Sequence, residues 1–234
     1  ADRPALALAD FDLALSMNPD HVPSLGSRAR IFEAQGKLDL ALADYTKALT
    51  LSPKDVNLLT GRAGVYLALG QPDQAIADYN QAIALDGSLA QSYGGRARAN
   101  EAAGKLAEAA ADYTKAIELD PENAAYVFGR GTVRAAQADA ANALADFSRA
   151  IELDPSFASA YANRGRIYVE QDDLDAALAD YSQAIELEPK NAGAYHNRGS
   201  VYHNLGEIDK ALADYTQALT LDPGFVAAYN SRAR

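Results

Sequence analysis

Few residues of the kinds that carry out catalysis stand in a catalytic arrangement in this sequence. It has no cysteine, which excludes a thiolate nucleophile, a disulfide and a thiolate metal site. It also has no glycine-rich phosphate loop, no G-x-S-x-G sequence and no His-Glu-x-x-His sequence. Asp172, Asp173 and Asp175 lack the glycine and the distal glutamate of a calcium loop, and acidic residues commonly open a helix. We therefore expect no enzyme activity, no metal and no cofactor.

Two of the histidines, His196 and His203, are seven residues apart. On one helix this spacing puts both side chains on the same face, but it separates them by roughly 10.5 Å along the axis. That distance is too long for one shared zinc ion. We expect these histidines to contact a bound peptide or to face water.

Charged residues recur in this sequence with a strict period of 34. An Asp followed by an aromatic residue returns at that interval, and an Arg returns 16 residues before one such Asp and 18 after another. Because a partly buried guanidinium needs an acceptor, we expect Arg–Asp pairs between adjacent helices; an anion-binding stripe is the alternative. The recurring residues are Asp10, Asp44, Asp78, Asp112, Asp146, Asp180 and Asp214, with Arg28, Arg62, Arg96, Arg130, Arg164, Arg198 and Arg232.

Pairs of helices carry these residues. Apolar residues recur at helical spacing after residue 158, are interrupted at Asp172 and Asp173, and resume from Leu174 to Leu187. Gly holds most of the turns, and Pro ends most of the second helices. The sequence predicts a helix, a tight turn and a second helix in each unit. The complete units are 22–55, 56–89, 90–123, 124–157, 158–191 and 192–225, and partial units cover 1–21 and 226–234.

The pattern of small and aromatic residues resembles the tetratricopeptide repeat, and the likeness covers essentially the whole chain. It implies an all-α fold: an α-solenoid that forms one array, a right-handed superhelix of antiparallel helix pairs, with each first helix lining a concave groove. We expect the array to be an excerpt of a longer chain. In residues 158–191 the pattern consists of Tyr161, Gly165, Tyr168, Ala177, Tyr181, Ala184 and Pro189.

Two successive repeats in the middle depart from this pattern. Asn100 and Arg134 stand where a buried aromatic residue is usual, and Ala138 replaces the turn glycine. We expect the middle of the array to be its least stable part.

Repeat positions are counted from the first residue of each unit, so that position 1 is residue 22, 56, 90, 124, 158, 192 or 226. By the resemblance, repeat positions 2, 5, 6, 9, 12 and 13 face the groove. At position 6, Asn163 and Asn197 resemble the asparagines with which such arrays hold an extended peptide, since an amide both donates and accepts hydrogen bonds. An Asn on a solvated helix face is the alternative. The lysines of the family's carboxylate clamp are absent, so we do not expect a receptor for chaperone C-termini.

Arginines occupy position 9 of every second repeat. Several cations in one groove of an acidic protein point to a carboxylate on the ligand. The alternative is an ion pair within each helix, because a Glu follows three or four residues later. The arginines are Arg30, Arg98, Arg166 and Arg234, and the glutamates are Glu33, Glu101 and Glu170.

The overall composition limits the partners. A net charge of −11 and a pI of about 4.7 argue against nucleic acid, and no apolar run is long enough to insert into a membrane. The lack of cysteine leaves the compartment open. We expect a soluble protein, with the cytoplasm favoured over the periplasm or secretion.

Two functional hypotheses follow. The first is a protein–protein interaction scaffold that binds an extended peptide of a partner in the groove. The second is an assembly module that associates with itself end to end, or links to domains outside this stretch. The predicted groove residues are Asn163, Asn197, Arg166, His196, His203, Arg98 and Arg30.

Overall fold

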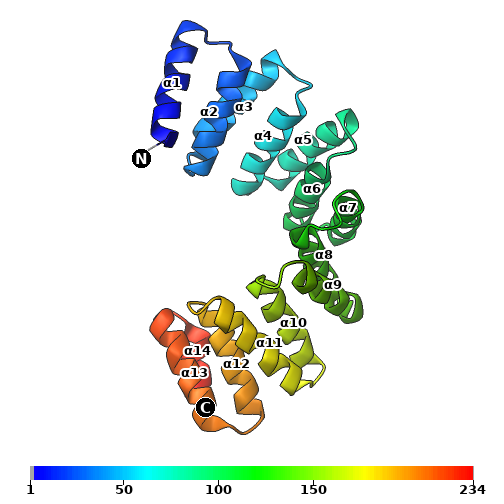
Figure 1. Ribbon diagram of the computed structural model, residues 1–234, viewed down its shortest axis with the longest axis vertical. Coiled ribbons are helices and arrows are strands. Elements are labelled where there is room, and N and C mark those ends of the chain that lie inside the picture. The colour runs from blue at the N-terminus through cyan, green and yellow to red at the C-terminus, as the bar shows by residue number, and fades with distance from the viewer. Residues whose placement is uncertain (1–2, 234) are drawn as a thin grey trace. The chain divides into compact units, whose positions relative to one another are not determined.

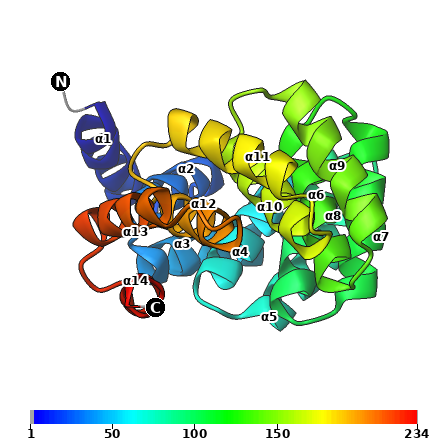
Figure 2. The same ribbon diagram turned by 90° about the horizontal axis from the view of Figure 1, so that it is seen from below.

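The computed structural model describes residues 3–233, and helices are its only regular elements in that range. Successive helices run antiparallel, as the ribbon shows from two directions (Figure 1 and Figure 2). The chain divides into two compact units, one that ends at Pro121 and one that begins at Glu122. The predicted all-α fold of paired helices is confirmed.

The first unit contains three helix pairs preceded by one further helix. The first helices of its pairs are α2, α4 and α6, and α4 contacts both α2 and α6. The elements are α1 (Arg3–Met17), α2 (Val22–Ala34), α3 (Leu38–Leu51), α4 (Val56–Ala68), α5 (Pro72–Leu85), α6 (Ala90–Ala102) and α7 (Leu106–Leu119).

The second unit also contains three helix pairs, followed by a short helix. Its first helices are α8, α10 and α12. The elements are α8 (Ala124–Ala136), α9 (Ala140–Leu153), α10 (Ala158–Glu170), α11 (Leu174–Leu187), α12 (Ala192–Asn204), α13 (Ile208–Leu221) and α14 (Val226–Arg232).

Alanines at two repeat positions allow the helices of a pair to pack closely. At positions 20 and 27 of the complete repeats, every alanine is at most 1% exposed. The aromatic residue at position 24 is buried beside them, as Tyr45 and Phe147 illustrate. Small side chains bring helix backbones together and the ring fills the remaining space, so the core runs along the line where first and second helices meet.

The turns inside the pairs use a left-handed residue. Gly36, Gly70, Gly104 and Gly206 have φ between 70° and 76°, a conformation that glycine adopts without a steric cost. In the remaining two pairs, the turn residues are Ala138 (φ 61°) and Asp172 (φ 63°). Their Cβ atoms make this conformation unfavourable.

The two departures at position 11 have a common structural consequence. Asn100 is buried and its Nδ2 donates to Asp112 Oδ2 at 3.0 Å. Arg134 Nη1 donates to Asp146 Oδ2 at 2.7 Å. Both polar side chains therefore bond to the recurring Asp where other repeats place an aromatic ring. The lower stability that we expect for the middle of the array remains a prediction.

Replacing Ala138 by Gly should stabilise the protein by about 1 kcal/mol, because it removes the Cβ from a left-handed residue. The matched control is Ala145→Gly in α9, an exposed alanine inside a regular helix, which should lose about 1 kcal/mol. Urea unfolding followed by circular dichroism measures both. Equal destabilisation by the two substitutions would contradict the strain at Ala138.

Candidate functional site

A cavity of about 540 Å³ lies in the first unit between the first helices α2, α4 and α6. Its walls come mainly from repeat positions 2, 5, 6, 9 and 12, which agrees with the groove face expected from the resemblance. The lining residues that matter most for its chemistry are Arg30, Glu33, Tyr45, Asp55, Asn57, Thr60, Gly61, Gly64, Tyr79, Gln91 and Arg98.

Glycines at position 6 let tyrosines from the second helices reach this cavity. A Cβ on Gly61 would lie 2.6 Å from the Tyr45 ring, and one on Gly95 would lie 2.3 Å from the Tyr79 ring. Neither position has room for a side chain while the ring stays in place. The two phenols therefore form part of the cavity floor.

The second unit packs the same aromatic position differently. There, the ring lies against glycine at position 8 of its own repeat: a Cβ on Gly131 would be 2.9 Å from Phe147, and one on Gly165 would be 3.4 Å from Tyr181. Position 6 of the following repeat then carries a side chain, such as Asn163. At position 6, α4 and α6 thus carry a glycine covered by a tyrosine ring, whereas α10 and α12 carry asparagine side chains.

Glu33 is held at the cavity by a tyrosine and not by the arginine on its own helix. Tyr45 Oη donates to Glu33 Oε2 at 3.2 Å. Burial, with the nearby Glu33 carboxylate, raises the pKa of Tyr45, so the phenol keeps its proton as the donor. Tyr113 donates to Glu101 in the same way, at 3.3 Å. The sequence raised the alternative of direct ion pairs between Arg30 and Glu33 and between Arg98 and Glu101. Neither ion pair occurs among the described residues.

Arg30 and Arg98 are exposed, and neither has an ion-pair partner among the described residues. Arg166 differs: its Nη1 donates to Glu170 Oε1 at 2.5 Å, so here the predicted intrahelical pair does form. The fourth arginine of this set, Arg234, lies outside the described residues. The structure thus brings two of the predicted arginines, Arg30 and Arg98, to one cavity and gives a third an acceptor of its own.

The predicted amides and imidazoles lie in the second unit and bond to nearby groups. Asn163 Nδ2 donates to the Ser159 carbonyl at 2.9 Å. His196 bonds to Ser231 Oγ at 3.1 Å and packs on the Phe225 ring at 5.0 Å. Asn197 Oδ1 lies 3.4 Å from His196 Nδ1.

His203 lies at the end of α12 beside a smaller hollow. It is exposed and lines a cavity of about 160 Å³ with Ser200, Asn204, Tyr215 and Ser231. No group of three or more His, Cys, Asp or Glu residues suited to a metal ion occurs in the part of the chain that the structure describes.

The predicted Arg–Asp pairs are confirmed as bidentate ion pairs. Arg164 shows the arrangement: Nε and Nη2 donate to Asp180 at 2.8 Å each, while Nη1 donates to Ser148 Oγ of the preceding second helix at 3.0 Å. The bond to Asp180 raises the pKa of the guanidinium. The equivalent pairs are Arg28–Asp44, Arg62–Asp78, Arg96–Asp112, Arg130–Asp146 and Arg198–Asp214.

Sequence reasoning missed the cavity residues that do not stand at recurring charged positions. Glu33, Tyr45, Tyr79 and Gly64 were absent from the predicted groove set. A signal was present: where position 8 is Ala, position 6 of the next repeat is Gly, and where position 8 is Gly, the next position 6 is Asn or Ser. The paired positions are Ala29 with Gly61, Ala63 with Gly95, Gly131 with Asn163, Gly165 with Asn197 and Gly199 with Ser231.

Family models agree with this repeat geometry along most of the chain. Models described as tetratricopeptide repeat match residues 1–56, 32–98, 90–123 and 192–225, and a model described as TPR repeat matches 139–172 and 165–206. The chain belongs to the tetratricopeptide repeat family. Proteins built from this repeat are in general non-catalytic scaffolds for protein–protein interaction.

Solved tetratricopeptide repeat structures share the fold. A chain of the APC/C hetero-tetramer Cut9-Hcn1 superposes with a TM-score of 0.83 at 19% identity; the match covers 99% of this chain but only 46% of that one. Pseudomonas aeruginosa pilF gives 0.80 at 18% identity, covering 91% and 96%. YrrB, described as a TPR protein with an unusual peptide-binding site, gives 0.65 at 26% identity, covering 81% and 98%.

Two further findings concern this tetratricopeptide repeat chain. No curated protein matches it. Among the described residues, no helix is both long enough and apolar enough to cross a membrane.

Replacing Arg164 by Ala should lower the free energy of unfolding by about 3 kcal/mol, because it leaves the buried Asp180 carboxylate without its partner. Arg166→Ala on the same helix is the control: its exposed pair with Glu170 should contribute less than about 0.5 kcal/mol. Thermal unfolding measures the loss of stability in each of the two variants. Similar losses would show that the recurring pair has no special structural role.

Proposed function

We propose that the first unit binds an extended segment of a partner protein in the cavity between α2, α4 and α6. The observation that carries this proposal is the cavity itself, about 540 Å³ with a polar lining drawn from three successive first helices. A cavity that crosses several parallel helices suits a chain that runs across them, and a few fixed polar groups then orient it. YrrB, a TPR protein with an unusual peptide-binding site, is a precedent within the family.

The cavity supplies the two kinds of contact that an extended peptide needs. Asn57 and Gln91 offer amides that both donate and accept, which suits the alternating N–H and C=O groups of a backbone. Gly64 brings the backbone of α4 to the cavity without a side chain, so a ligand can approach closely.

We also propose that the first helices of the second unit contribute contacts of their own. Asn163 uses one N–H on its own helix, which leaves its carbonyl oxygen as an acceptor. His203 and Arg166 are exposed, whereas His196 and Asn197 are half-buried. In this proposal the second unit is an auxiliary surface, and the cavity of the first unit is the principal site.

Gly64→Leu tests the principal site with little risk to the fold. The only non-neighbouring atom within 4 Å of a Cβ there is Glu33 Oε1 at 3.4 Å, at the end of a flexible side chain, and Leu favours a helix over Gly by up to about 1 kcal/mol. The variant should therefore stay folded and fill the cavity. Peptides selected from an array by the unaltered protein should bind it at least tenfold more weakly in fluorescence anisotropy.

The control is Ala77→Leu, an exposed alanine on α5 of the same repeat, which should leave binding unchanged. An Asn163→Ala, Asn197→Ala double variant adds a comparison with the second unit. Peptides that bind Gly64→Leu normally but lose affinity for the double variant would place the principal site in the second unit and refute the proposal.

Self-association is the second candidate function, and two exposed apolar faces favour it. On α1, Leu6 and Met17 are 70% and 74% exposed, and on α14, Val226 is 68% exposed. Large apolar side chains gathered on one surface mark contact sites. A head-to-tail contact between α14 of one copy and α1 of another would cover both faces.

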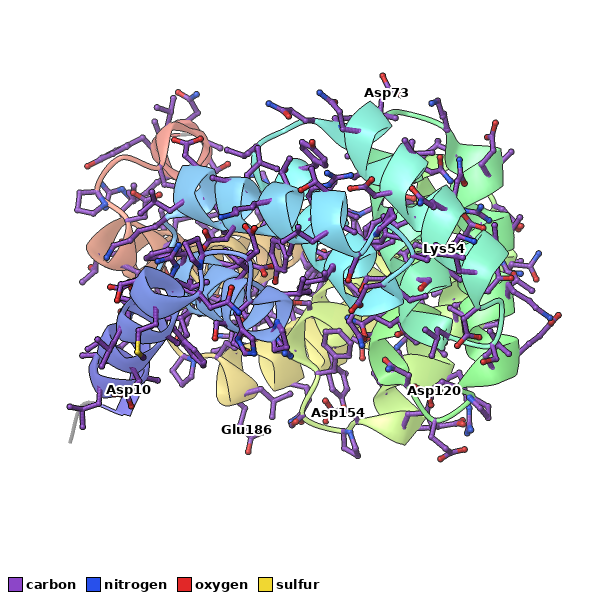
Figure 3. All side chains as sticks on the ribbon, turned by 90° about the horizontal axis from the view of Figure 1, so that it is seen from above. Asp10, Lys54, Asp73, Asp120, Asp154 and Glu186 are labelled. Carbon is purple, nitrogen blue, oxygen red and sulfur yellow. The ribbon has the colours of Figure 1, made fainter. Side chains whose placement is uncertain are left out.

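The recurring ion pair favours the same arrangement. Arg232 occupies position 7 and Asp10 occupies position 23, the positions that bond to each other in the complete repeats. Both are exposed, and Asp10 is seen on α1 in Figure 3. In a head-to-tail contact, these two residues of different copies would form an ion pair of the same kind.

Charge reversal tests this contact. The unaltered chain should form larger species as its concentration rises in sedimentation velocity, whereas Arg232→Asp should stay monomeric because it would face Asp10 of the next copy. Adding Asp10→Arg to that variant restores opposite charges and should restore association. A chain that is monomeric at every concentration would eliminate this candidate.

A further inference from the structure

The arginines at the cavity of the first unit are available to a ligand. Arg30 projects from α2 and Arg98 from α6, both are exposed, and both line the cavity. Each guanidinium offers five N–H donors in a fixed fork that matches a carboxylate. By contrast, Arg28 and Arg96, two residues earlier in each helix, use that fork on a buried Asp.

The acidic residues at the cavity are already engaged. Glu33 accepts the hydrogen bond of Tyr45. Asp55 is the N-cap of α4 and accepts from the backbone N–H groups of Asn57 and Leu58 at 2.9 and 3.1 Å. Both carboxylates still repel a bound anion through space, but neither forms an ion pair with an arginine at the cavity. Among the charged groups of this site, those without a bonding partner in the described residues are therefore the cations Arg30 and Arg98.

Apart from the buried Asp residues that pair with arginines, many acidic side chains lie on the surface of the chain. The net charge is −11, and acidic side chains such as Asp73 and Glu186 point away from the ribbon (Figure 3). An acidic ligand would be repelled by the chain as a whole and attracted at the cavity by Arg30 and Arg98. Such a pattern favours a ligand that places its charges at those two points.

We propose that the cavity of the first unit takes an acidic extended segment, with one side-chain carboxylate on Arg30 and a second on Arg98. This proposal rests on the proposed peptide-binding function and names the chemistry of its ligand. Between the two carboxylates, the segment passes over Gly64, which occupies position 9 of the intervening helix α4 and has no side chain. Asn57 and Gln91 bond to its backbone.

The helix arrangement sets the spacing of the two acidic residues. The two arginines stand at the same repeat position on α2 and α6, with α4 in contact with both helices between them. Packed helices lie about 8–10 Å apart, so two steps span roughly 16–20 Å. An extended chain advances about 3.3 Å per residue. The two acidic residues should thus be about five or six positions apart.

Three labelled peptides of ten residues test the spacing by fluorescence anisotropy with the whole chain. The first has Glu at positions 3 and 8 in a Ser/Thr/Val background, the second has the same composition with Glu at positions 5 and 6, and the third has Gln at positions 3 and 8. The first should bind about tenfold more tightly than the second, since only the first places a second carboxylate on an arginine, a charged hydrogen bond worth about that factor. It should bind about a hundredfold more tightly than the third, which has neither carboxylate.

Protein variants identify which side chains bind the first peptide. Arg30→Gln and Arg98→Gln should each weaken binding of the first peptide about tenfold and reduce its salt dependence. Glu33→Gln should strengthen it about threefold, because it removes a nearby like charge. Arg149→Gln, an exposed arginine on the second helix α9 that is already paired with Glu152, is the control and should change nothing. Circular dichroism of each variant verifies that it is folded.

The outcomes separate this inference from the function on which it rests. Equal binding of the Glu and Gln peptides, abolished by Gly64→Leu, would overturn the acidic ligand and retain the groove. Binding of the first peptide that Gly64→Leu leaves unchanged would overturn both, because the peptide would lie elsewhere. Absence of binding by all three peptides would overturn the acidic ligand, and the peptide array would still decide the proposed function.

Discussion

The ion pair between the Arg at position 7 and the Asp at position 23 is the interaction on which the rest of the structure depends. The alanines that bring the two helices of a repeat together bury little apolar surface each, and they do not by themselves specify one register. A bidentate pair has a defined geometry. Because Arg164 also bonds to Ser148 of the preceding second helix, one guanidinium joins three helices. Where this further bond is present, as it is also at Arg28, Arg96 and Arg198, the arginine specifies both the repeat and its contact with the previous one.

Neighbouring side chains complete the surroundings of this pair. The guanidiniums of Arg62 and Arg198 lie 5.7 and 5.8 Å from the ring centroids of Tyr66 and Tyr202 at position 11, within the range of a cation–π contact. Asn100 and Arg134 at that position approach the same Asp instead. A ring is therefore not essential there, provided that the buried carboxylate has its hydrogen bonds.

With the helices held in this way, the units differ through the placement of one aromatic ring. In the first unit, Tyr45 passes Gly61 to reach Glu33 at the cavity. In the second, Tyr181 lies against Gly165, and Asn197 carries the side chain at position 6. A difference of a few atoms at two glycine positions thus changes the chemical nature of the surface of a first helix without changing the fold, because the ring occupies whichever site has no Cβ.

The sequence by itself determined the period, the helix pairs, the turn and terminating residues, the buried alanines and the Arg–Asp pairs. These features are local or repeated, so spacing along the chain is enough to identify them. Only the tertiary structure decided which position-9 arginines are available to a ligand. The spacing of Arg30 to Glu33 and of Arg166 to Glu170 allowed an ion pair in both cases, but Tyr45 on another helix takes Glu33. Which of several acceptors a side chain meets depends on competition between helices in space, and a spacing rule within one helix does not contain that information.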